Sequence, residues 1–253
     1  MRTAFVTMAD SKFLIGCDVL VYSIEKNSPG FFEKCDAKIL LALDKDIKSF
    51  RDFDIIYVDP SKYKYCRISR AAVSPSKLFL FTLTQFDKII FYEADTVCVG
   101  NINELHSNKL EKYDFAACRI YYESSKAPRT YNGKNIFLGD GWVVNKRLLT
   151  GKFYDELISC AENKSNCRGE QEIITHTLED HHYNTRTLSP IFDVISFIDN
   201  STIEPYSTYF NDARIYHITS KSKPWILIGN YTKPSKKMVE KWMSIYNEKI
   251  NAV

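Results

Sequence analysis

The chain has 253 residues, of which 45% are hydrophobic and 26% are charged, and its 34 basic and 31 acidic side chains give a net charge of +3. This length and composition are typical of a globular protein with a substantial core, and they exclude a chain dominated by disorder. The near balance of charge does not favour a general binder of nucleic acid or of membrane surfaces, although it permits local basic patches.

The amino-terminal sequence, MRTAFVTMADSKFLIGCDVL, lacks the basic, apolar and small-residue segments of a secretory signal, and the chain has no apolar run of membrane-spanning length. The seven cysteines are scattered, odd in number, and form no C-x-x-C pair. We therefore expect a cytoplasmic protein with free thiols.

The first quarter of the chain alternates strand and helix patterns. A β-branched and aromatic run at residues 3–7 predicts a first strand, and apolar residues then recur every three or four positions from Phe13 to Ile24, which predicts an amphipathic helix. Two further apolar runs, at 37–43 and 54–58, predict buried strands. This order indicates a parallel sheet with helices on its faces.

An acid pair follows the next predicted strand. The basic, tyrosine-containing segment 61–79 is either a flap that meets an anion or a solvated surface loop, and a helix is expected at 77–85. The apolar run from Ile89 to Tyr92 then predicts a strand that delivers Glu93 and Asp95 at its end. Side chains two apart on a strand point to the same face, so these carboxylates could share one cation. The alternative is ordinary loop solvation, because an E-x-D pair is common.

The second half of the chain is less regular. Gly139 and Gly141 flank Asp140 just before a predicted strand, which indicates either a close backbone approach or a turn. No internal repeat or low-complexity linker is visible, so we predict one domain over residues 1–253, with the last helix packing on it. The other expected elements are a strand at 115–121, an exposed loop at 123–134, helices at 146–161 and from 170, a bent strand at 188–198, a strand at 214–217 and an amphipathic helix at 235–247.

Three candidate elements fall at strand ends, where open parallel sheets bind ligands. They are the Glu93 and Asp95 pair, the Gly139–Gly141 loop, and His217 followed by Lys223. Two carboxylates and one imidazole suit a hard divalent cation such as Mn²⁺, which keeps positions open for phosphate oxygens. Taken alone, His217 is more often a core or surface histidine than a ligand.

Four segments share an order and spacing that is specific, although each segment alone is weak evidence. They are FVTMADSKF at 5–13, SKLFLFTLTQFDKIIFYEADTV at 76–97, GEQEIITHTL at 169–178 and HITSKSKPW at 217–225. Together they resemble the family 8, glycogenin-like retaining glycosyltransferases of the GT-A fold, from about Ala4 to Trp225. The resemblance implies an α/β domain with a mostly parallel central sheet flanked by helices.

The resemblance also implies a reaction and a site. The reaction is metal-dependent transfer of a hexose from a UDP-sugar, UDP-glucose or UDP-galactose, to a hydroxyl of a carbohydrate or protein acceptor. The resemblance assigns Mn²⁺ or Mg²⁺ to Glu93, Asp95 and His217, and it places Gln171 and Glu170 at the sugar as catalytic residues. Its donor contacts are Thr7, Met8, Asp10, Phe13, Lys77, Ala94, Ser220 and Lys223, and its sugar contacts are Gly139, Asp140 and Gly141.

Four positions depart from the family pattern. Glu93 and Glu170 each replace an Asp, Ser220 replaces a Gly, and Gly139 replaces an Asn. These changes leave the donor sugar open. The changes at Glu93, Gly139 and Ser220 also favour a second hypothesis, a protein of the same fold that binds a nucleotide sugar without transferring it.

The acceptor is not specified by the sequence. Self-glycosylation of a tyrosine, as in glycogenin, stays open, and Tyr121, Tyr122 and Tyr131 lie near the predicted exposed loop. A homodimer also stays open, because dimers are common among the relatives. No nucleic-acid partner is expected.

Overall fold

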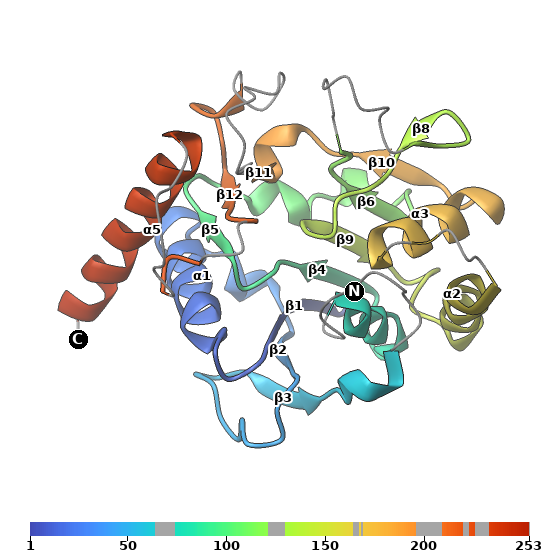
Figure 1. The fold of residues 1–253 in the computed structure, drawn as a ribbon, viewed down its shortest axis with the longest axis horizontal. Helices are drawn as coiled ribbons and strands as arrows, with labels where there is room; N and C mark the ends of the chain where they lie inside the picture. The colour runs from blue at the N-terminus through green and yellow to red at the C-terminus, as the bar shows by residue number, and fades with distance from the viewer. Residues whose placement is uncertain are drawn as a thin grey trace.

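The structure is a computed structural model that describes residues 1–63, 74–120, 130–163, 167, 169–195, 209–219, 223–225 and 233–252 (Figure 1). Its centre is a seven-stranded sheet of order β10-β6-β9-β4-β1-β2-β3, in which β9 runs antiparallel to both of its neighbours and the other pairs are parallel. The strands are β1 (Thr3–Ala9), β2 (Ala37–Ala42), β3 (Asp54–Tyr57), β4 (Lys88–Phe91), β6 (Phe115–Ala117), β9 (Trp142–Asn145) and β10 (Thr185–Thr187).

Helices cover both faces of this sheet. On one face lie α1 (Leu14–Asn27) and α5 (Lys233–Asn251), which contact each other, and on the other lie α2 (Gly151–Asn163), α3 (Glu170–Asp180) and the 3₁₀ segment η3 (Ser74–Thr82) (Figure 1). Every residue of β1, β4 and β9 is buried. The strands are therefore nearly continuous apolar runs, because neither face of the central sheet meets water.

A second, three-stranded sheet lies beside the first. Its order is β11 (Val194–Ile195), β12 (Ile215–His217), β5 (Thr96–Cys98), and β12 runs antiparallel to β5 with His217 opposite Thr96. The strand β5 directly follows the predicted acid pair. Because β12 pairs with β5, His217 lies close to Glu93 and Asp95, although it is far from them in the sequence.

Most predicted elements are present, with shifted ends. The predicted helix at 77–85 is wrong in type, because Ser74–Thr82 forms a 3₁₀ helix after Pro75, and the predicted helix at 146–161 begins only at Gly151. The predicted strand at 188–198 is interrupted, since Pro190–Phe192 forms the 3₁₀ turn η6 and only Val194–Ile195 pairs. Residues 196–198 lie outside the described residues.

Part of the predicted loop at 123–134 is a β-hairpin. Residues 121–129 lie outside the described residues, but β7 (Thr130–Tyr131) and β8 (Lys134–Asn135) form a hairpin. Its turn residues, Asn132 and Gly133, both have positive φ, at 49° and 75°. An Asn-Gly pair adopts this conformation readily, which explains the tight turn. The predicted strand at 115–121 is a regular strand only from Phe115 to Ala117, after which Arg119 forms an isolated antiparallel bridge with Phe137.

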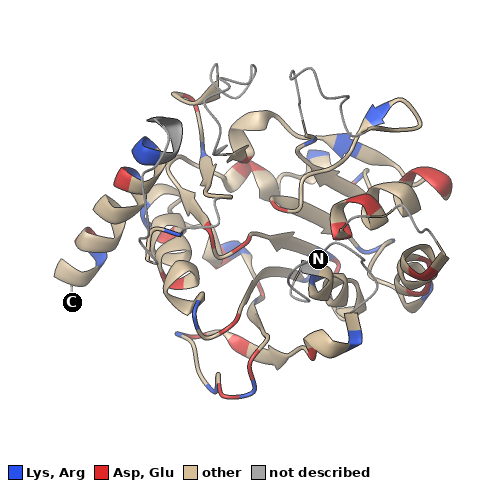
Figure 2. Cartoon of the chain, in the orientation of Figure 1, with Lys and Arg blue, Asp and Glu red and all other residues tan. Residues whose placement is uncertain are grey.

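The remaining short segments are 3₁₀ turns on the surface of the fold. They are η1 (Phe32–Lys34), η2 (Pro60–Tyr63), η4 (Asn103–His106) and η5 (Asn108–Leu110). Basic and acidic residues are interspersed along the described chain (Figure 2). Within the part of the chain that is described, no helix has the length and apolarity that a membrane span requires.

Candidate active site

Three potential metal ligands converge at the end of β4. Nε2 of His217 lies 3.4 Å from Oε2 of Glu93 and 3.4 Å from Oδ1 of Asp95, and the three ligand atoms lie within 4.8 Å of one another. Neighbouring ligands of an octahedral cation with bonds near 2.1 Å are about 3 Å apart. The three side chains would therefore fit one face of such a coordination shell if their ligand atoms moved slightly closer to one another.

Backbone hydrogen bonds hold these ligands in place. The amide of Ile218 donates to the carbonyl of Asp95 at 2.9 Å, which extends the ladder between β12 and β5 to the acid pair. The amide of Glu93 donates to Oδ1 of Asp140 at 2.6 Å. The loop between β4 and β5 is thus tied to β12 on one side and to the segment before β9 on the other.

Each acid of the pair also has a lysine partner. Nζ of Lys77 lies 2.7 Å from Oε1 of Glu93, and Lys223 pairs with the carboxylate of Asp95 and donates to the carbonyl of Ile218 at 2.7 Å. Burial disfavours the charge on both acids, but Lys77 lowers the pKa of Glu93 and Lys223 lowers the pKa of Asp95 below their ordinary values. Both acids are therefore ionised at neutral pH, as metal ligands must be.

Two further acids lie behind the histidine. Nδ1 of His217 lies 3.0 Å from Oδ1 of Asp193 and 3.8 Å from Oδ2 of Asp140, and both carboxylates are fully buried. Burial raises the pKa of each of these two acids. Burial opposes a charge on His217, but Asp193 and Asp95 outweigh it and raise the pKa of His217 well above its usual range. An acid on Nδ1 orients the imidazole so that Nε2 faces the acid pair.

Sequence reasoning did not identify Asp193 as a site residue. The signal that could have found it is its isolation, because it is a single acid in the otherwise apolar stretch 188–198. Asp140, predicted as a sugar contact, is fully buried between the backbone of Glu93 and the ring of His217.

The predicted sugar-side residues meet around Gly139. Nζ of Lys77 donates to Oε1 of Glu170 at 2.9 Å and to the carbonyl of Gly139 at 3.0 Å. A Cβ atom at Gly139 would lie 2.8 Å from Nε2 of Gln171 and 2.9 Å from Oε1 of Glu170. Gly139 therefore lies in close approach to the ends of these side chains, whereas Gly141 has φ +66° and makes a turn. Of the two interpretations of this glycine pair, the close approach applies to Gly139 and the turn applies to Gly141.

The predicted nucleotide-side residues cluster where β1 runs into α1. Thr7 and Met8 are buried at the end of β1, and Oδ1 of Asp10 accepts hydrogen bonds from the amides of Lys12 and Phe13 at 2.9 and 3.0 Å. The ring of Phe13 meets the ring of Trp225 edge to face, with centroids 5.3 Å apart. The closing KPW segment thus lies against the first loop.

Two other predicted donor contacts have different outcomes. Ala94 is buried, lies between Glu93 and Asp95 in the chain, and its carbonyl packs against Gly16 of α1. Ser220 lies outside the described residues, as do Tyr121, Tyr122 and most of the basic segment, residues 64–73. Lys223, by contrast, is described and belongs to the cluster.

The architecture defines a class of protein. A mostly parallel sheet covered by helices on both faces, with an acid pair after a central strand and a histidine delivered by a small second sheet, is the GT-A glycosyltransferase fold. The chain belongs to glycosyl transferase family 8, because the sequence model of that family matches residues 5–229.

Several characterised proteins are similar in sequence. A lipopolysaccharide 1,2-glucosyltransferase of Escherichia coli is 27% identical over 184 residues, which cover 67% of this chain and 52% of that protein. Glycogenin-1 of Oryctolagus cuniculus is 26% identical over 171 residues, which cover 65% of this chain and 44% of that protein. The chain thus spans about half the length of these two relatives.

Solved structures show the same fold at lower sequence identity. The galactosyltransferase LgtC, solved with donor and acceptor sugar analogs, matches with a TM-score of 0.71 at 12% identity, over 97% of this chain and 95% of that one. Mouse xyloside xylosyltransferase 1 matches with a TM-score of 0.55 at 14% identity, over 90% of this chain and 100% of that one. The GT-A fold expected from the sequence is confirmed.

Proposed function

We propose that this protein is a metal-dependent retaining glycosyltransferase that moves a hexose from a UDP-sugar to a hydroxyl acceptor. The observation that carries the proposal is the convergence of Glu93, Asp95 and Nε2 of His217, with contacts of 3.4 Å, beside the amine of Lys223. The acids and histidine offer ligands to a cation, and the lysine offers a charge to a diphosphate. A cation and the diphosphate of one nucleotide sugar would use both features together.

The ligand set fits a hard divalent cation. Carboxylate oxygens with one imidazole suit Mn²⁺ or Mg²⁺ and leave positions for phosphate oxygens. Glu93, Asp95 and His217 would hold the ion, and Asp193 would orient the histidine through Nδ1. When bound, such an ion offsets the negative charge that develops on a departing diphosphate.

The side chains of this chain have separate roles in the proposed transfer. Lys223, held by the carbonyl of Ile218, supplies a second positive charge to the diphosphate as the anomeric carbon–oxygen bond breaks. Gln171 positions the sugar without attacking it, because an amide is a poor nucleophile. The acceptor oxygen bonds to the anomeric carbon on the face that the diphosphate leaves, and a diphosphate oxygen takes the acceptor proton.

The hexose identity rests on similarity alone. The relatives and neighbours include a glucosyltransferase and a galactosyltransferase, which supports UDP-glucose or UDP-galactose as donor. A xylosyltransferase has the same fold, so the panel of UDP-sugars that tests the donor includes UDP-xylose. The cytoplasmic location and the homodimer stay predictions, which fractionation and light scattering test.

A second candidate function is binding of a nucleotide sugar without transfer. The observation that favours it is the pair of ion contacts that neutralise the acids without a cation, from Lys77 to Glu93 at 2.7 Å and from Lys223 to Asp95. A site already balanced in this way has less need of a metal. With Mn²⁺ and a UDP-sugar, a transferase should release UDP, whereas a protein that only binds the UDP-sugar should not.

The experiment that separates them uses purified protein, Mn²⁺ and a panel of UDP-sugars. A transferase releases UDP slowly without an acceptor, and EDTA stops the release, whereas a binder protects the UDP-sugar without hydrolysing it. Intact-mass measurement of the same samples detects self-glycosylation as added hexose masses. Binding of a UDP-sugar with no UDP release under any metal would overturn the transferase proposal.

A further inference from the structure

A second cluster of potential metal ligands lies outside the candidate active site. Cys160, Cys167 and His176 each offer one ligand atom, and these atoms lie within 4.8 Å of one another. Sγ of Cys167 is 3.4 Å from Nδ1 of His176. Among the groups of three potential ligands found in the described residues, this is the one built on thiols.

We propose that Cys160, Cys167 and His176 form a zinc site. Zinc prefers thiolate and imidazole ligands in a tetrahedral shell, with bonds of about 2.3 Å to sulfur and about 2.0 Å to nitrogen. Those bond lengths place a sulfur and a nitrogen about 3.5 Å apart on one edge of the tetrahedron. The contact between Cys167 and His176 has this length before any ion is added.

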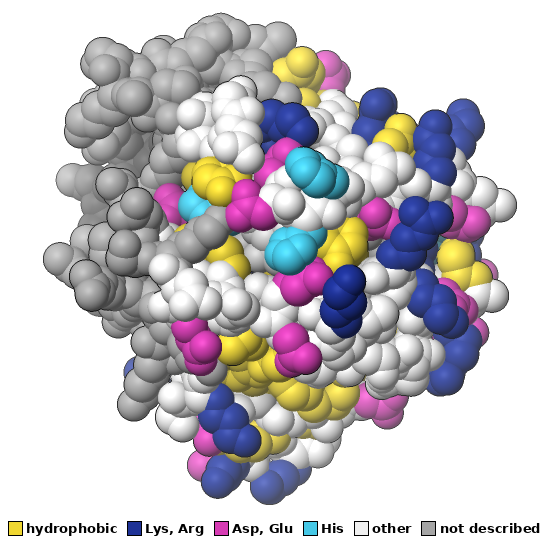
Figure 3. All heavy atoms as spheres, turned by 90° about the vertical axis from the view of Figure 1, so that its right-hand side faces the viewer, with side chains coloured by type: hydrophobic (Ala, Val, Ile, Leu, Met, Phe, Trp, Pro, Cys, Tyr) yellow, Lys and Arg dark blue, Asp and Glu magenta, His cyan; other side chains and the backbone are white. Residues whose placement is uncertain are grey.

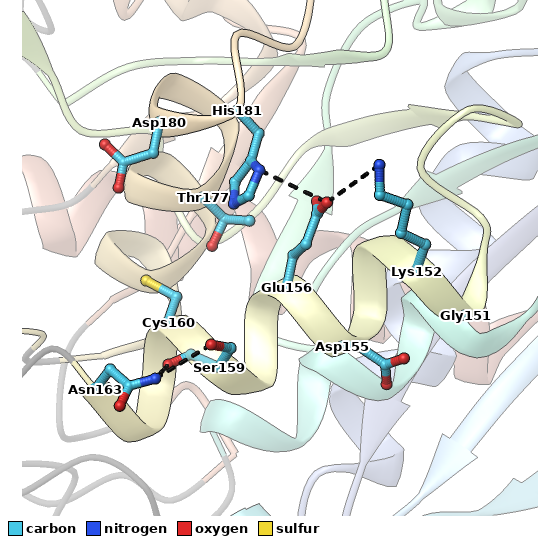
Figure 4. Close-up of a pocket in the computed structure, with 10 residues that line it drawn as sticks. All are labelled: Gly151, Lys152, Asp155, Glu156, Ser159, Cys160, Asn163, Thr177, Asp180 and His181. Atoms are coloured by element: carbon cyan, nitrogen blue, oxygen red, sulfur yellow. Dashed lines mark hydrogen bonds and ion pairs between the residues drawn. The ribbon is translucent and has the colours of Figure 1, made fainter.

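Neighbouring side chains fix the positions of the proposed zinc ligands, and a surface depression gives an ion access to the site. Cys167 and His176 are 6% and 8% exposed, and the ring of Tyr131 stacks on His176 with centroids 3.8 Å apart, which fixes the plane of the imidazole. Cys160 projects from α2 toward α3 and lines a surface depression of about 750 Å³ between these helices (Figure 4). An ion could reach the thiol of Cys160 through this depression, and a metal site requires such a route.

Asp155, Glu156, Asp180 and His181 line this depression, and the face drawn in Figure 3 carries histidine, acidic and basic side chains. In the close-up, Glu156 lies between His181, at 3.6 Å, and Lys152, at 3.7 Å (Figure 4). Carboxylates near the opening attract a cation, while the thiols behind them select a softer metal than the oxygen ligands of Glu93 and Asp95 do. The chain would thus carry two sites with different metal preferences.

The position of the site suggests what bound zinc would do. Cys160 lies near the end of α2, Cys167 in the connection after it, and His176 on α3, the helix that begins with Glu170 and Gln171. His176 is six residues beyond Glu170, which is about 9 Å along the helix. Zinc would therefore fix the connection between two helices and, through it, the start of α3 at the sugar side of the active site.

Metal binding tests the site directly. The purified protein is prepared in an Asp95→Ala background, which removes a ligand of the other site, and is loaded with Co²⁺ and then with Zn²⁺. We expect one thiolate-to-cobalt charge-transfer signal, displaced by one equivalent of zinc. The signal should fall at least tenfold in Cys160→Ser, Cys167→Ser and His176→Ala. Matched controls, Cys35→Ser and His181→Ala, should keep it, since Cys35 lies in another part of the chain.

A second measurement needs no substitution at the site. Zinc should protect Cys160 and Cys167 of the otherwise unaltered chain from alkylation, mapped by mass spectrometry, with partly exposed Cys35 as the internal reference. Saturating zinc should also raise the midpoint of thermal unfolding by about 5 to 10 °C. The proposal is overturned by the absence of a thiolate signal, by a signal that survives loss of both cysteines, or by a Cys160–Cys167 disulfide that forms while zinc gives no protection.

Discussion

Nδ1 of His217 lies 3.0 Å from Oδ1 of Asp193, and both side chains are buried behind the acid pair. The contact orients the imidazole so that its other nitrogen, Nε2, points between Glu93 and Asp95. Asp193 would therefore orient His217 as a metal ligand in the proposed site without belonging to the Glu93, Asp95 and His217 group itself.

Loss of the charge on Asp193 should weaken metal binding. In Asp193→Asn we expect the Mn²⁺ concentration for half-maximal UDP release to rise about tenfold or more, since supporting groups of this kind carry effects of that size. Turnover at saturating Mn²⁺ should change much less. The exposed Asp212 provides the control, because Asp212→Asn should leave both quantities unchanged. Equal Mn²⁺ requirements in the two variants would show that Asp193 has no such role.

The two acids of the pair should respond differently to substitution. Asp95→Ala removes a ligand and the partner of Lys223, so metal-dependent transfer should be abolished. Glu93→Asp keeps a carboxylate and restores the residue usual in the family, so it should keep or improve turnover. It also shortens the side chain that meets Lys77 at 2.7 Å, so that contact should lengthen.

UDP release assayed with and without EDTA checks both variants. Undiminished turnover in Asp95→Ala would contradict its role as a ligand. A complete loss in Glu93→Asp, with the fold intact by circular dichroism, would indicate that this corner of the sheet has another function.

A methyl group at Gly139 should disturb the sugar side. In Gly139→Ala the new Cβ would lie 2.8 Å from Nε2 of Gln171 and 3.1 Å from Nζ of Lys77, closer than side chains normally allow. Because Lys77 is buried and Gln171 is the more adaptable neighbour, we expect Gln171 to move and kcat to fall about 10- to 100-fold. Gly151→Ala is the matched control, since nothing lies within 4 Å of a Cβ there. Wild-type kcat in Gly139→Ala would show that Gln171 need not be held in this position.

Buried Lys88 should make stability depend on pH. Its Nζ has no hydrogen-bond partner among the described residues, and burial lowers its pKa from 10.5 to about 8. Between those values the unfolded chain binds more protons at this site than the folded chain, so the contribution of Lys88 to stability rises with pH across that window. The free energy of unfolding should gain about 2 kcal/mol from this residue between pH 7.5 and pH 10.

Substitution isolates that contribution. Lys88→Met should raise the free energy of unfolding at pH 7.5 and remove the gain, because the buried amine is gone. Urea unfolding at several pH values measures both effects, and the exposed Lys109→Met serves as control. Parallel pH profiles for the wild type and Lys88→Met would contradict the assignment.

Local pattern was sufficient for much of the fold. The apolar runs at β1 and β4 and the helical spacing in α1 each depend on residues close in sequence, and the structure contains these elements with ends shifted by a few residues. The helix predicted at 77–85 failed because Pro75 and the packing of Leu78 and Phe81 against the sheet favour a 3₁₀ path that periodicity does not distinguish.

The sequence by itself determined the family and the strand β4, which the acid pair Glu93 and Asp95 follows. The roles that it predicts for the site residues stay predictions. Only the tertiary structure decided which side chains meet: His217 reaches the acids because β12 pairs with β5, and Asp193 reaches His217 because β11 pairs with β12. Contacts between residues so far apart in the chain depend on strand register and helix packing, which local patterns do not encode. The same reason explains why Cys160, Cys167 and His176, scattered in the sequence, form one cluster in space.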